Sequence, residues 1–99
     1  MPSYIKAPEA DIDLLEIWSY IAQNSFEVAD NFLDRLEAGF EQLAEQPLMG
    51  RKREELRPGL RSLTVGNYFI FYWVIDDRVE VVRVLNATRD IEAIFAEPL

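Results

Sequence analysis

The chain has 99 residues, a formal net charge of −8, and neither cysteine nor histidine. This composition excludes disulfides, thiolate metal sites and cysteine nucleophiles, and it removes the side chain that most often serves as a general base or metal ligand. The length suits one domain, residues 1–99, with a small core. The first residues contain no hydrophobic signal core, so we expect a soluble, cytoplasmic protein.

Charge is distributed unevenly along the chain. Residues 1–49 carry ten acids against two bases, whereas residues 50–99 carry eight of each. An acidic half does not favour direct binding to nucleic acid, which depends on neutralising phosphates. We interpret the acidic half as a solvated helix surface. A mimic of nucleic acid, or a dock for a basic partner, is the alternative.

The first part of the chain predicts a short strand and a helix. Residues 3–7 can form the strand, and Pro8 suits the first turn of a helix because its missing N–H costs nothing there. Apolar residues at helical spacing predict a helix over residues 9–24. Its inner stripe consists of Leu14, Ile17, Trp18 and Ile21, and its outward acids are Asp11, Asp13 and Glu16.

A second helix is predicted after a break at residues 24–25. Ser25 is a suitable N-cap because its hydroxyl can accept a hydrogen bond from the first turn, and the helix must end before Pro47. The short connection between the two helices predicts an antiparallel hairpin. The apolar stripe of the second helix consists of Ala29, Phe32, Leu33, Leu36, Phe40 and Leu43.

The second half predicts three strands, over residues 60–65, 68–75 and 78–85. Each connection is two residues long, which favours an antiparallel meander and sets its register. The central run is too short to span a bilayer. Residues 48–59 are predicted to be a linker, and residues 90–96 a short C-terminal helix.

Alternation along these strands separates two faces of the sheet. The predicted register places Arg61 beside Tyr72 and Val81, and Leu63 beside Ile70 and Arg83. We expect the helices to cover the face with Arg61, Leu63, Val65, Tyr68, Ile70, Tyr72, Val74, Val79, Val81, Arg83 and Leu85. The second face carries Leu60, Ser62, Thr64, Phe69, Phe71, Trp73, Ile75, Arg78, Glu80, Val82 and Val84.

The second face is unusually apolar for a surface in contact with solvent. Three aromatic residues follow one another along its central strand, and we expect the C-terminal segment to cover only part of them. Burial of apolar surface contributes about 25 cal/mol per Å², so leaving even ~200 Å² in contact with water loses several kcal/mol of stabilising free energy. A partner that covered this face would recover that free energy.

Several segments together resemble one known family. They are Ala-Asp-Ile-Asp-Leu-Leu-Glu-Ile-Trp-Ser-Tyr-Ile-Ala at 10–22, Gln-Pro-Leu-Met-Gly-Arg at 46–51, Pro-Gly-Leu-Arg-Ser at 58–62, Tyr-Phe-Ile-Phe-Tyr at 68–72, and Val-Val-Arg-Val-Leu-Asn-Ala-Thr-Arg-Asp at 81–90. Over nearly the whole chain the sequence resembles ParE toxins, of the RelE/ParE superfamily of type II toxin–antitoxin systems. The resemblance agrees with the predicted α+β fold: a short N-terminal strand, an antiparallel helical hairpin, a three-stranded antiparallel meander and a short C-terminal helix.

The superfamily divides by chemistry, since RelE-like members cut mRNA on the ribosome whereas ParE-like members resemble inhibitors of DNA gyrase. The nucleases carry lysines where this chain has Leu60 and Ser62, and an arginine where it has Phe69. Arg89 matches their arginine after the last strand, but Asn86 stands where related nucleases, and often ParE members, have histidine. RNA cleavage needs a proton acceptor and a group that stabilises the pentavalent phosphate. The substitutions therefore indicate a toxin that is not an enzyme.

The resemblance implies a surface that binds an antitoxin. We expect this surface to be the aromatic face, with Phe69, Phe71, Trp73, Val82 and Val84 as its contacts. The alternative is that the C-terminal segment or a second copy of the chain covers these residues.

Three arginines are candidates for contact with the target, namely Arg61, Arg83 and Arg89. Arg61 and Arg83 are predicted on the core face, where an unpaired charge is costly. Each could instead have a structural role by pairing with an acid such as Glu16 or Asp90. Arg89 could contact the target or pair with a helix.

Two further clusters have simpler interpretations. The basic run at residues 51–53 is followed at once by two acids, which favours a solvated loop over a phosphate site. Asp13 and Glu16 are spaced along a helix surface with no histidine nearby, so we expect no metal site and no cofactor.

The sequence therefore predicts a toxin that binds and inhibits DNA gyrase, and that a ParD-like antitoxin neutralises in a hetero-oligomeric complex. We expect neither direct nucleic-acid binding nor membrane binding. The rivals are a ribosome-dependent mRNA interferase of RelE type, and a degenerate toxin that acts only as an antitoxin-binding module.

Overall fold

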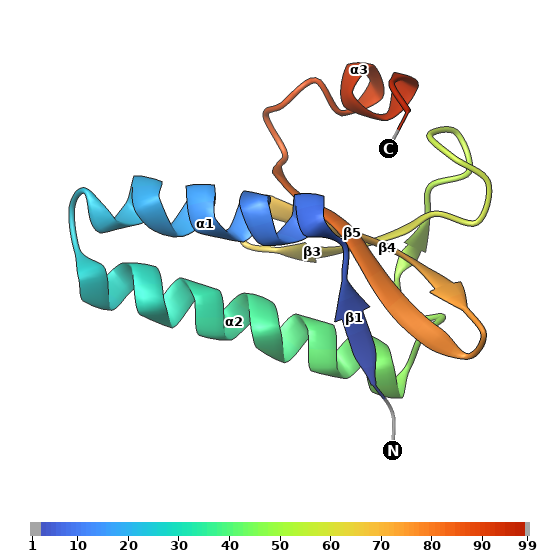
Figure 1. The fold of residues 1–99 in the computed structure, drawn as a ribbon, viewed down its shortest axis with the longest axis horizontal. Helices are drawn as coiled ribbons and strands as arrows, with labels where there is room; N and C mark the ends of the chain where they lie inside the picture. Colours follow the sequence, from blue (N-terminus) through green and yellow to red (C-terminus); the bar gives the residue numbers. More distant parts are fainter. Residues whose placement is uncertain (1–2, 99) are drawn as a thin grey trace.

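The computed structural model describes residues 3–98 and confirms the predicted α+β architecture. Figure 1 shows two long helices side by side, a sheet beside them and a short third helix at the top of the view. The elements are β1 (Tyr4–Lys6), α1 (Pro8–Ala22), α2 (Phe26–Glu45), β2 (Arg51–Lys52), β3 (Arg61–Val65), β4 (Tyr68–Ile75), β5 (Arg78–Asn86) and α3 (Ile91–Ala96). Residues 1, 2 and 99, which the predicted domain includes, lie outside the described residues.

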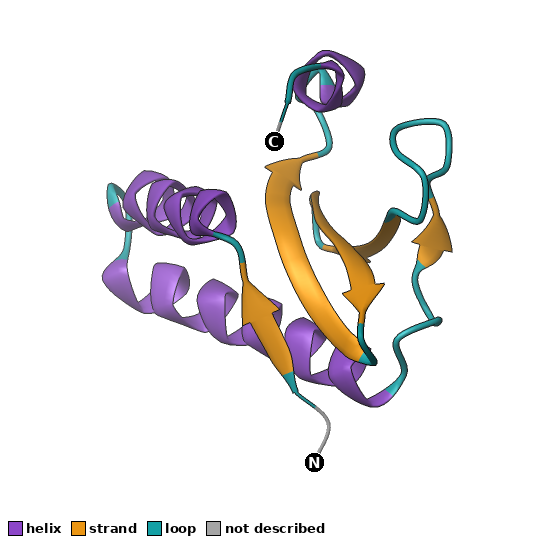
Figure 2. Cartoon of the chain, turned by 45° about the vertical axis from the view of Figure 1, so that its right-hand side comes forward, coloured by secondary structure: helices purple, strands orange, loops and turns teal. Residues whose placement is uncertain are grey.

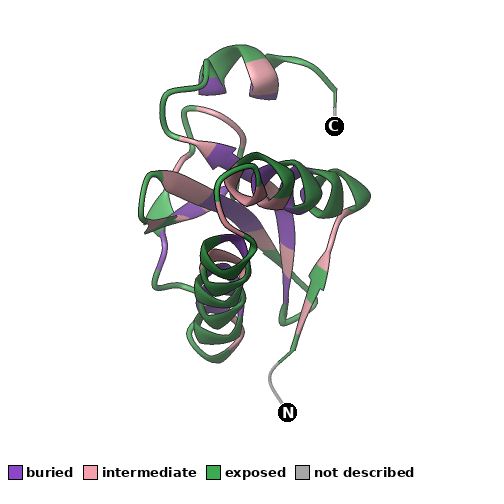
Figure 3. Ribbon diagram, turned by 90° about the vertical axis from the view of Figure 1, so that its left-hand side faces the viewer, coloured by how far each residue is buried: buried purple, intermediate pink, exposed green. Residues whose placement is uncertain are grey.

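The helices α1 and α2 form the predicted hairpin and cover one face of the sheet. The hydroxyl of Ser25 accepts a hydrogen bond from the Val28 amide at 3.2 Å, which confirms the predicted N-cap. Figure 3 shows the outward turns of both helices exposed and the sheet behind them largely buried. The main core joins Leu14, Ile17, Leu36, Phe40 and Leu43 of the helices to Ile70, Tyr72, Val79, Val81 and Val84 of the sheet.

The sheet has five strands in the order β1-β5-β4-β3-β2, with the predicted meander at its centre (Figure 2). The N-terminal strand lies parallel to β5, with Tyr4 opposite Val79. At the other edge, Arg51 of β2 lies opposite Ser62 of β3. The predicted linker at residues 48–59 therefore contains a strand, which two residues are too few to reveal by alternation.

A β-bulge in β5 changes the predicted register. Val81 lies opposite Tyr72 as predicted, but the next pair along the ladder is Phe71 with Arg83. Val82 is therefore an extra residue with no partner on β4. The length of the connecting turn determines the register only as far as the first bulge, so the two-residue turn could not predict the pairing beyond Val81.

The bulge exchanges the faces of the residues that follow it. Ile70 lies opposite Val84, so its predicted pairing with Arg83 is wrong. Val84 is buried in the core under the helices, and Leu85 is buried in a second core on the other face. The predicted faces of both residues are wrong because one inserted residue reverses the alternation downstream.

The turn between β4 and β5 holds two adjacent residues in the left-handed region. Asp76 has φ = +50° and Asp77 has φ = +61°, which is the combination that a type I′ turn requires and that Asn-Gly fits best. We expect the double variant Asp76→Asn/Asp77→Gly to raise the free energy of unfolding by about 1 kcal/mol, because it relieves unfavourable backbone geometry. Urea denaturation measures this. The charge-matched control Asp34→Asn/Glu45→Gln on α2 should leave the stability unchanged, and an equal gain in both variants would contradict the backbone explanation.

Candidate functional site on the sheet and its flanks

The middle of the second face is closed by α3. Phe95 packs edge-on against Phe71 with 4.8 Å between ring centroids, and Phe71 is fully buried. Val82 is only 4% exposed. The expectation that these two residues form an open surface is therefore wrong, because α3 covers the centre of the strands. The second core also contains Leu60, Leu85 and Ile91.

Arg53 seals one side of this cover. Its guanidinium lies over two aromatic rings, with the Cζ atom 5.3 Å from the centroid of Phe69 and 5.4 Å from that of Phe71. The same side chain donates to Ser62 Oγ at 3.3 Å and to Glu55 Oε2 at 2.9 Å. The predicted solvated loop at residues 51–53 is therefore wrong for Arg53, which packs onto the sheet.

Arg57 holds the other side of the cover. It donates to the carbonyl oxygens of Phe95 at 3.0 Å and Glu97 at 2.6 Å. These carbonyls lie at the C-terminal end of α3, where the helix leaves acceptors unpaired and favours a cation. The loop before β3 thus fixes α3 over the sheet.

The apolar surface that remains open lies toward the β4–β5 turn. Trp73 is half-buried, and its Nε1 donates to Glu80 Oε1 at 2.7 Å. Ile75 and Ile5 are 49% and 44% exposed. A cleft of about 220 Å³ lies beside Trp73, and Glu9 of α1 contributes to its wall.

The structure therefore divides the five predicted antitoxin contacts. Phe69 and Trp73 keep accessible surface, whereas Phe71 and Val82 are buried under α3. Val84 lies on the opposite face, in the core under the helices. A partner can reach only the first two residues in this arrangement.

Arg61 has a structural role. Its Nη1 donates to the carbonyl oxygens of Leu48 at 3.1 Å and Gly50 at 2.9 Å. The Tyr72 hydroxyl holds the same segment, since it donates to Pro47 O at 2.7 Å and accepts from Gly50 N at 2.9 Å. Burial raises the pKa of Tyr72, which keeps this hydroxyl protonated.

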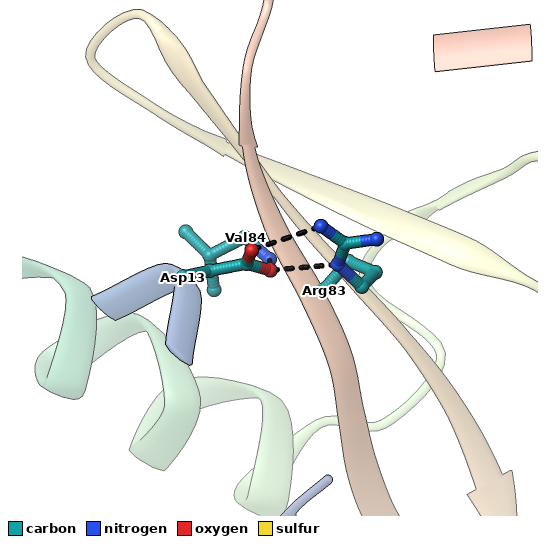
Figure 4. A network of polar contacts seen from close by, with 3 residues as sticks. All are labelled: Asp13, Arg83 and Val84. Atoms are coloured by element: carbon teal, nitrogen blue, oxygen red, sulfur yellow. Dashed lines mark hydrogen bonds and ion pairs between the residues drawn. The ribbon is translucent and has the colours of Figure 1, made fainter. Parts of the chain in front are cut away.

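Arg83 is bound by Asp13, a residue that helical spacing alone predicts to point outward. Asp13 is only 5% exposed, and it accepts from Arg83 Nε at 2.8 Å and from Arg83 Nη2 at 2.9 Å (Figure 4). The carboxylate also accepts from the Val84 amide at 2.9 Å. This hydrogen bonding raises the pKa of Arg83 against the opposing effect of burial. The outward prediction for Asp13 is wrong, and Arg83 pairs with neither Glu16 nor Asp90.

The third candidate, Arg89, is exposed and borders two clefts. One cleft, of about 540 Å³, lies between α1 and α3 and is lined by Glu9, Arg83, Ala93, Ile94, Glu97 and Pro98. The other, of about 130 Å³, lies between α1 and the end of β5 and is lined by Asp13, Glu16, Ile17, Tyr20, Tyr68, Val84 and Asn86. Of the three predicted target contacts, Arg89 is exposed, whereas Arg61 and Arg83 are half-buried.

Two classes of site find no support in residues 3–98. No group of three or more His, Cys, Asp or Glu side chains in this range is arranged to hold a metal ion. Within the same residues, every helix is too short or too polar to cross a membrane.

Known proteins resemble this chain along most of its length. Residues 4–91 match the family described as the ParE toxin of type II toxin–antitoxin system, parDE. The chain belongs to the ParE toxin family. The resemblance predicted from the sequence is thus confirmed, and the chain is a ParE toxin of a type II toxin–antitoxin system.

Individual ParE proteins show the extent of the likeness. Toxin ParE1 of Caulobacter vibrioides is 37% identical over 94 residues, covering 94% of this chain and 97% of that protein. Toxin ParE1 of Mycobacterium tuberculosis (strain H37Rv) is 33% identical over 91 residues, covering 90% and 93%. A solved structure described as the chromosomal ParDE TA system from P. aeruginosa shares the fold, with a TM-score of 0.74, 21% identity, and coverage of 87% of this chain and 96% of that chain.

Asp13 was not found as a site residue by sequence reasoning, although its spacing contains the signal. Ala10 and Ile17, three residues before and four after it, are both buried. A residue in that line faces the sheet regardless of its charge. An acid within the inner stripe of an amphipathic helix therefore indicates a buried partner.

We expect Asp13→Asn to lower the free energy of unfolding of this ParE toxin by about 2–3 kcal/mol, because Arg83 would lose its counter-charge. Urea denaturation measures the loss. Asp11→Asn is the matched control on the same helix, since Asp11 is exposed and lies 3.5 Å from Lys6 in a surface pair. The control should change the stability by no more than about 0.5 kcal/mol. Equal effects of the two variants would contradict a structural role for Asp13.

Proposed function

We propose that this ParE toxin acts in the cytoplasm by binding DNA gyrase, without catalysing RNA cleavage. The observation that supports this most is that buried and half-buried residues occupy the positions on the sheet where related nucleases carry basic side chains. Leu60 there is fully buried, and Ser62 is 5% exposed and accepts a hydrogen bond from Arg53. At these compared positions, which all lie within residues 3–98, Leu60, Ser62 and Phe69 supply no carboxylate or imidazole to take a proton from a 2′-hydroxyl.

Arg53, whose guanidinium packs on this part of the sheet, is also poorly placed for phosphate chemistry. Arg53 has a side chain only 13% exposed, and it is occupied by Glu55, Ser62 and two aromatic rings. Electrostatic catalysis needs donors aimed at the site where charge develops in the transition state. The hydrogen bonds of Arg53 point into the protein's own core and loop.

We propose that a ParD-like antitoxin neutralises the toxin in a hetero-oligomeric complex. Membership of the ParE family supports this, as does the open apolar surface around Trp73, with Ile5 and Ile75 beside it. Phe69 and Trp73 are the predicted contacts that the antitoxin can reach. Exposed apolar area of this kind is typical of surfaces that a protein partner covers.

Expression of the toxin alone in bacteria tests the mode of action. We expect growth arrest with an SOS response and intact mRNA, and we expect the purified toxin to inhibit supercoiling by gyrase. Co-expression of the antitoxin should restore growth. Cleaved mRNA without an SOS response would contradict the proposal in favour of an interferase, and normal growth would favour a degenerate antitoxin-binding module.

Arg89→Ala should weaken inhibition of gyrase supercoiling by about tenfold, because Arg89 is the exposed member of the three candidate arginines and the other two are held by hydrogen bonds within the fold. Arg78→Ala is the matched control, since Arg78 is also exposed but lies at the β4–β5 turn. Both variants should unfold with the same midpoint urea concentration as the wild type, which shows that they are folded. Equal inhibition by wild type and Arg89→Ala would remove Arg89 from the target interface.

A further inference from the structure

The helix α1 is apolar on its outer side as well as on its inner side. Ile12 is 57% exposed and Leu15 is 66% exposed, although both lie in the middle of the helix. The inner side of α1 packs against α2 and β5, whereas Figure 3 shows its outward turns exposed. A line of residues on this side, which we name the outer seam of α1, consists of the exposed Pro8, Ile12, Leu15 and Ser19 and the half-buried Ala22.

The spacing of the outer seam is that of a coiled coil. Its members follow one another at intervals of four, three, four and three residues, which is the repeat that keeps apolar side chains facing a second helix. Two heptads of helix are about 21 Å long. Small residues at Ser19 and Ala22 would let a partner helix approach closely at the end of the seam.

The seam continues into an aromatic pair at the end of the hairpin. Trp18 and Phe26 stack with ring centroids 5.6 Å apart, and Phe26 is 68% exposed. A hydrogen bond of 2.8 Å from Trp18 Nε1 to Asp30 Oδ1 fixes the indole. Leu15 precedes Trp18 by three residues and therefore lies beside it on the helix surface. The exposed apolar surface thus runs from the start of α1 to the start of α2.

Acidic residues border the seam on both sides. Glu9 and Glu16 lie along one flank, Asp11 lies along the other, and Asp30 adjoins the aromatic pair. A second copy of the chain would bring equal charges together, and each copy carries a net charge of −8. Basic residues at the corresponding flanks of a partner helix would instead form favourable pairs.

We propose that the outer seam of α1 binds an amphipathic helix of the antitoxin, with apolar residues at intervals of three and four and with Lys or Arg on both flanks. This inference rests on the proposed neutralisation by an antitoxin and adds the surface and the chemistry of the contact. The start of the seam adjoins the cleft beside Trp73, because Glu9 borders both. One antitoxin chain can therefore lie along α1 and continue onto the open part of the sheet.

Leu15→Lys tests the seam, because the substitution places a cation at its centre without disturbing the inner side of α1. Isothermal titration of the purified ParD-like antitoxin into the toxin should show a Kd at least about tenfold weaker for this variant. Val28→Lys is the control, since Val28 is 55% exposed on α2 and lies outside the seam. It should bind as wild type does. Circular dichroism and urea denaturation confirm that both variants are folded.

A charge-reversal variant, the salt dependence of binding and the oligomeric state of the toxin complete the test. Glu16→Lys should also weaken binding, and the wild-type affinity should fall as salt is raised. If the wild type binds the antitoxin and Leu15→Lys binds equally well, the seam is overturned while neutralisation by the antitoxin stands. If the wild type does not bind the antitoxin, both proposals fail. A dimer of the toxin alone that Leu15→Lys dissociates would overturn the antitoxin helix in favour of a second copy.

Discussion

The carboxylate of Asp13 joins the helical layer to the sheet at the point where β5 loses a strand neighbour. β1 pairs with β5 as far as Lys6 and Val81, and the chain then leaves the sheet to begin α1. Beyond that point the edge of β5 is open, and an unpaired amide there is costly if buried. Asp13 accepts from that edge at Val84 and binds the side chain of the preceding residue, Arg83. One carboxylate from the helix thus replaces the missing strand and holds α1 in register with the sheet.

The distribution of apolar surface follows from how this small chain covers two faces of one sheet. Two long helices cover the first face, and the second receives only six residues of α3. Arg53 and Arg57 make this short cover sufficient, because their stems and guanidinium groups add packing and hydrogen bonds around it. The apolar surface left for a partner is therefore displaced from the centre of the sheet to its turn end, near Trp73, and to the outer side of α1.

Most of the fold could be predicted because its elements obey simple periods. The helical stripes, the Ser25 cap and the two-residue turns each predicted the correct element, and the resemblance to the ParE family agreed with them. Two of the errors concern features that the local sequence pattern does not reveal. The bulge at Val82 and the burial of Phe71 under α3 leave no local signature. Asp13 differs, because its spacing in line with Ala10 and Ile17 is a local signal of burial. The prediction that it points outward followed instead the average preference of acidic residues for solvent.

The structure also concentrates the acidic character of the chain on its surface. Four arginines of the second half donate hydrogen bonds to acceptors within the fold, namely Arg53, Arg57, Arg61 and Arg83. Half of the basic residues of that segment are therefore occupied by contacts within the protein. The helical half, with ten acids against two bases, keeps most of its carboxylates exposed. Its field repels nucleic acid and attracts basic segments, and such attraction raises association rates more than final affinity. An antitoxin helix with basic flanks would thus be drawn to α1 first, and the apolar seam would then determine how long it stays bound.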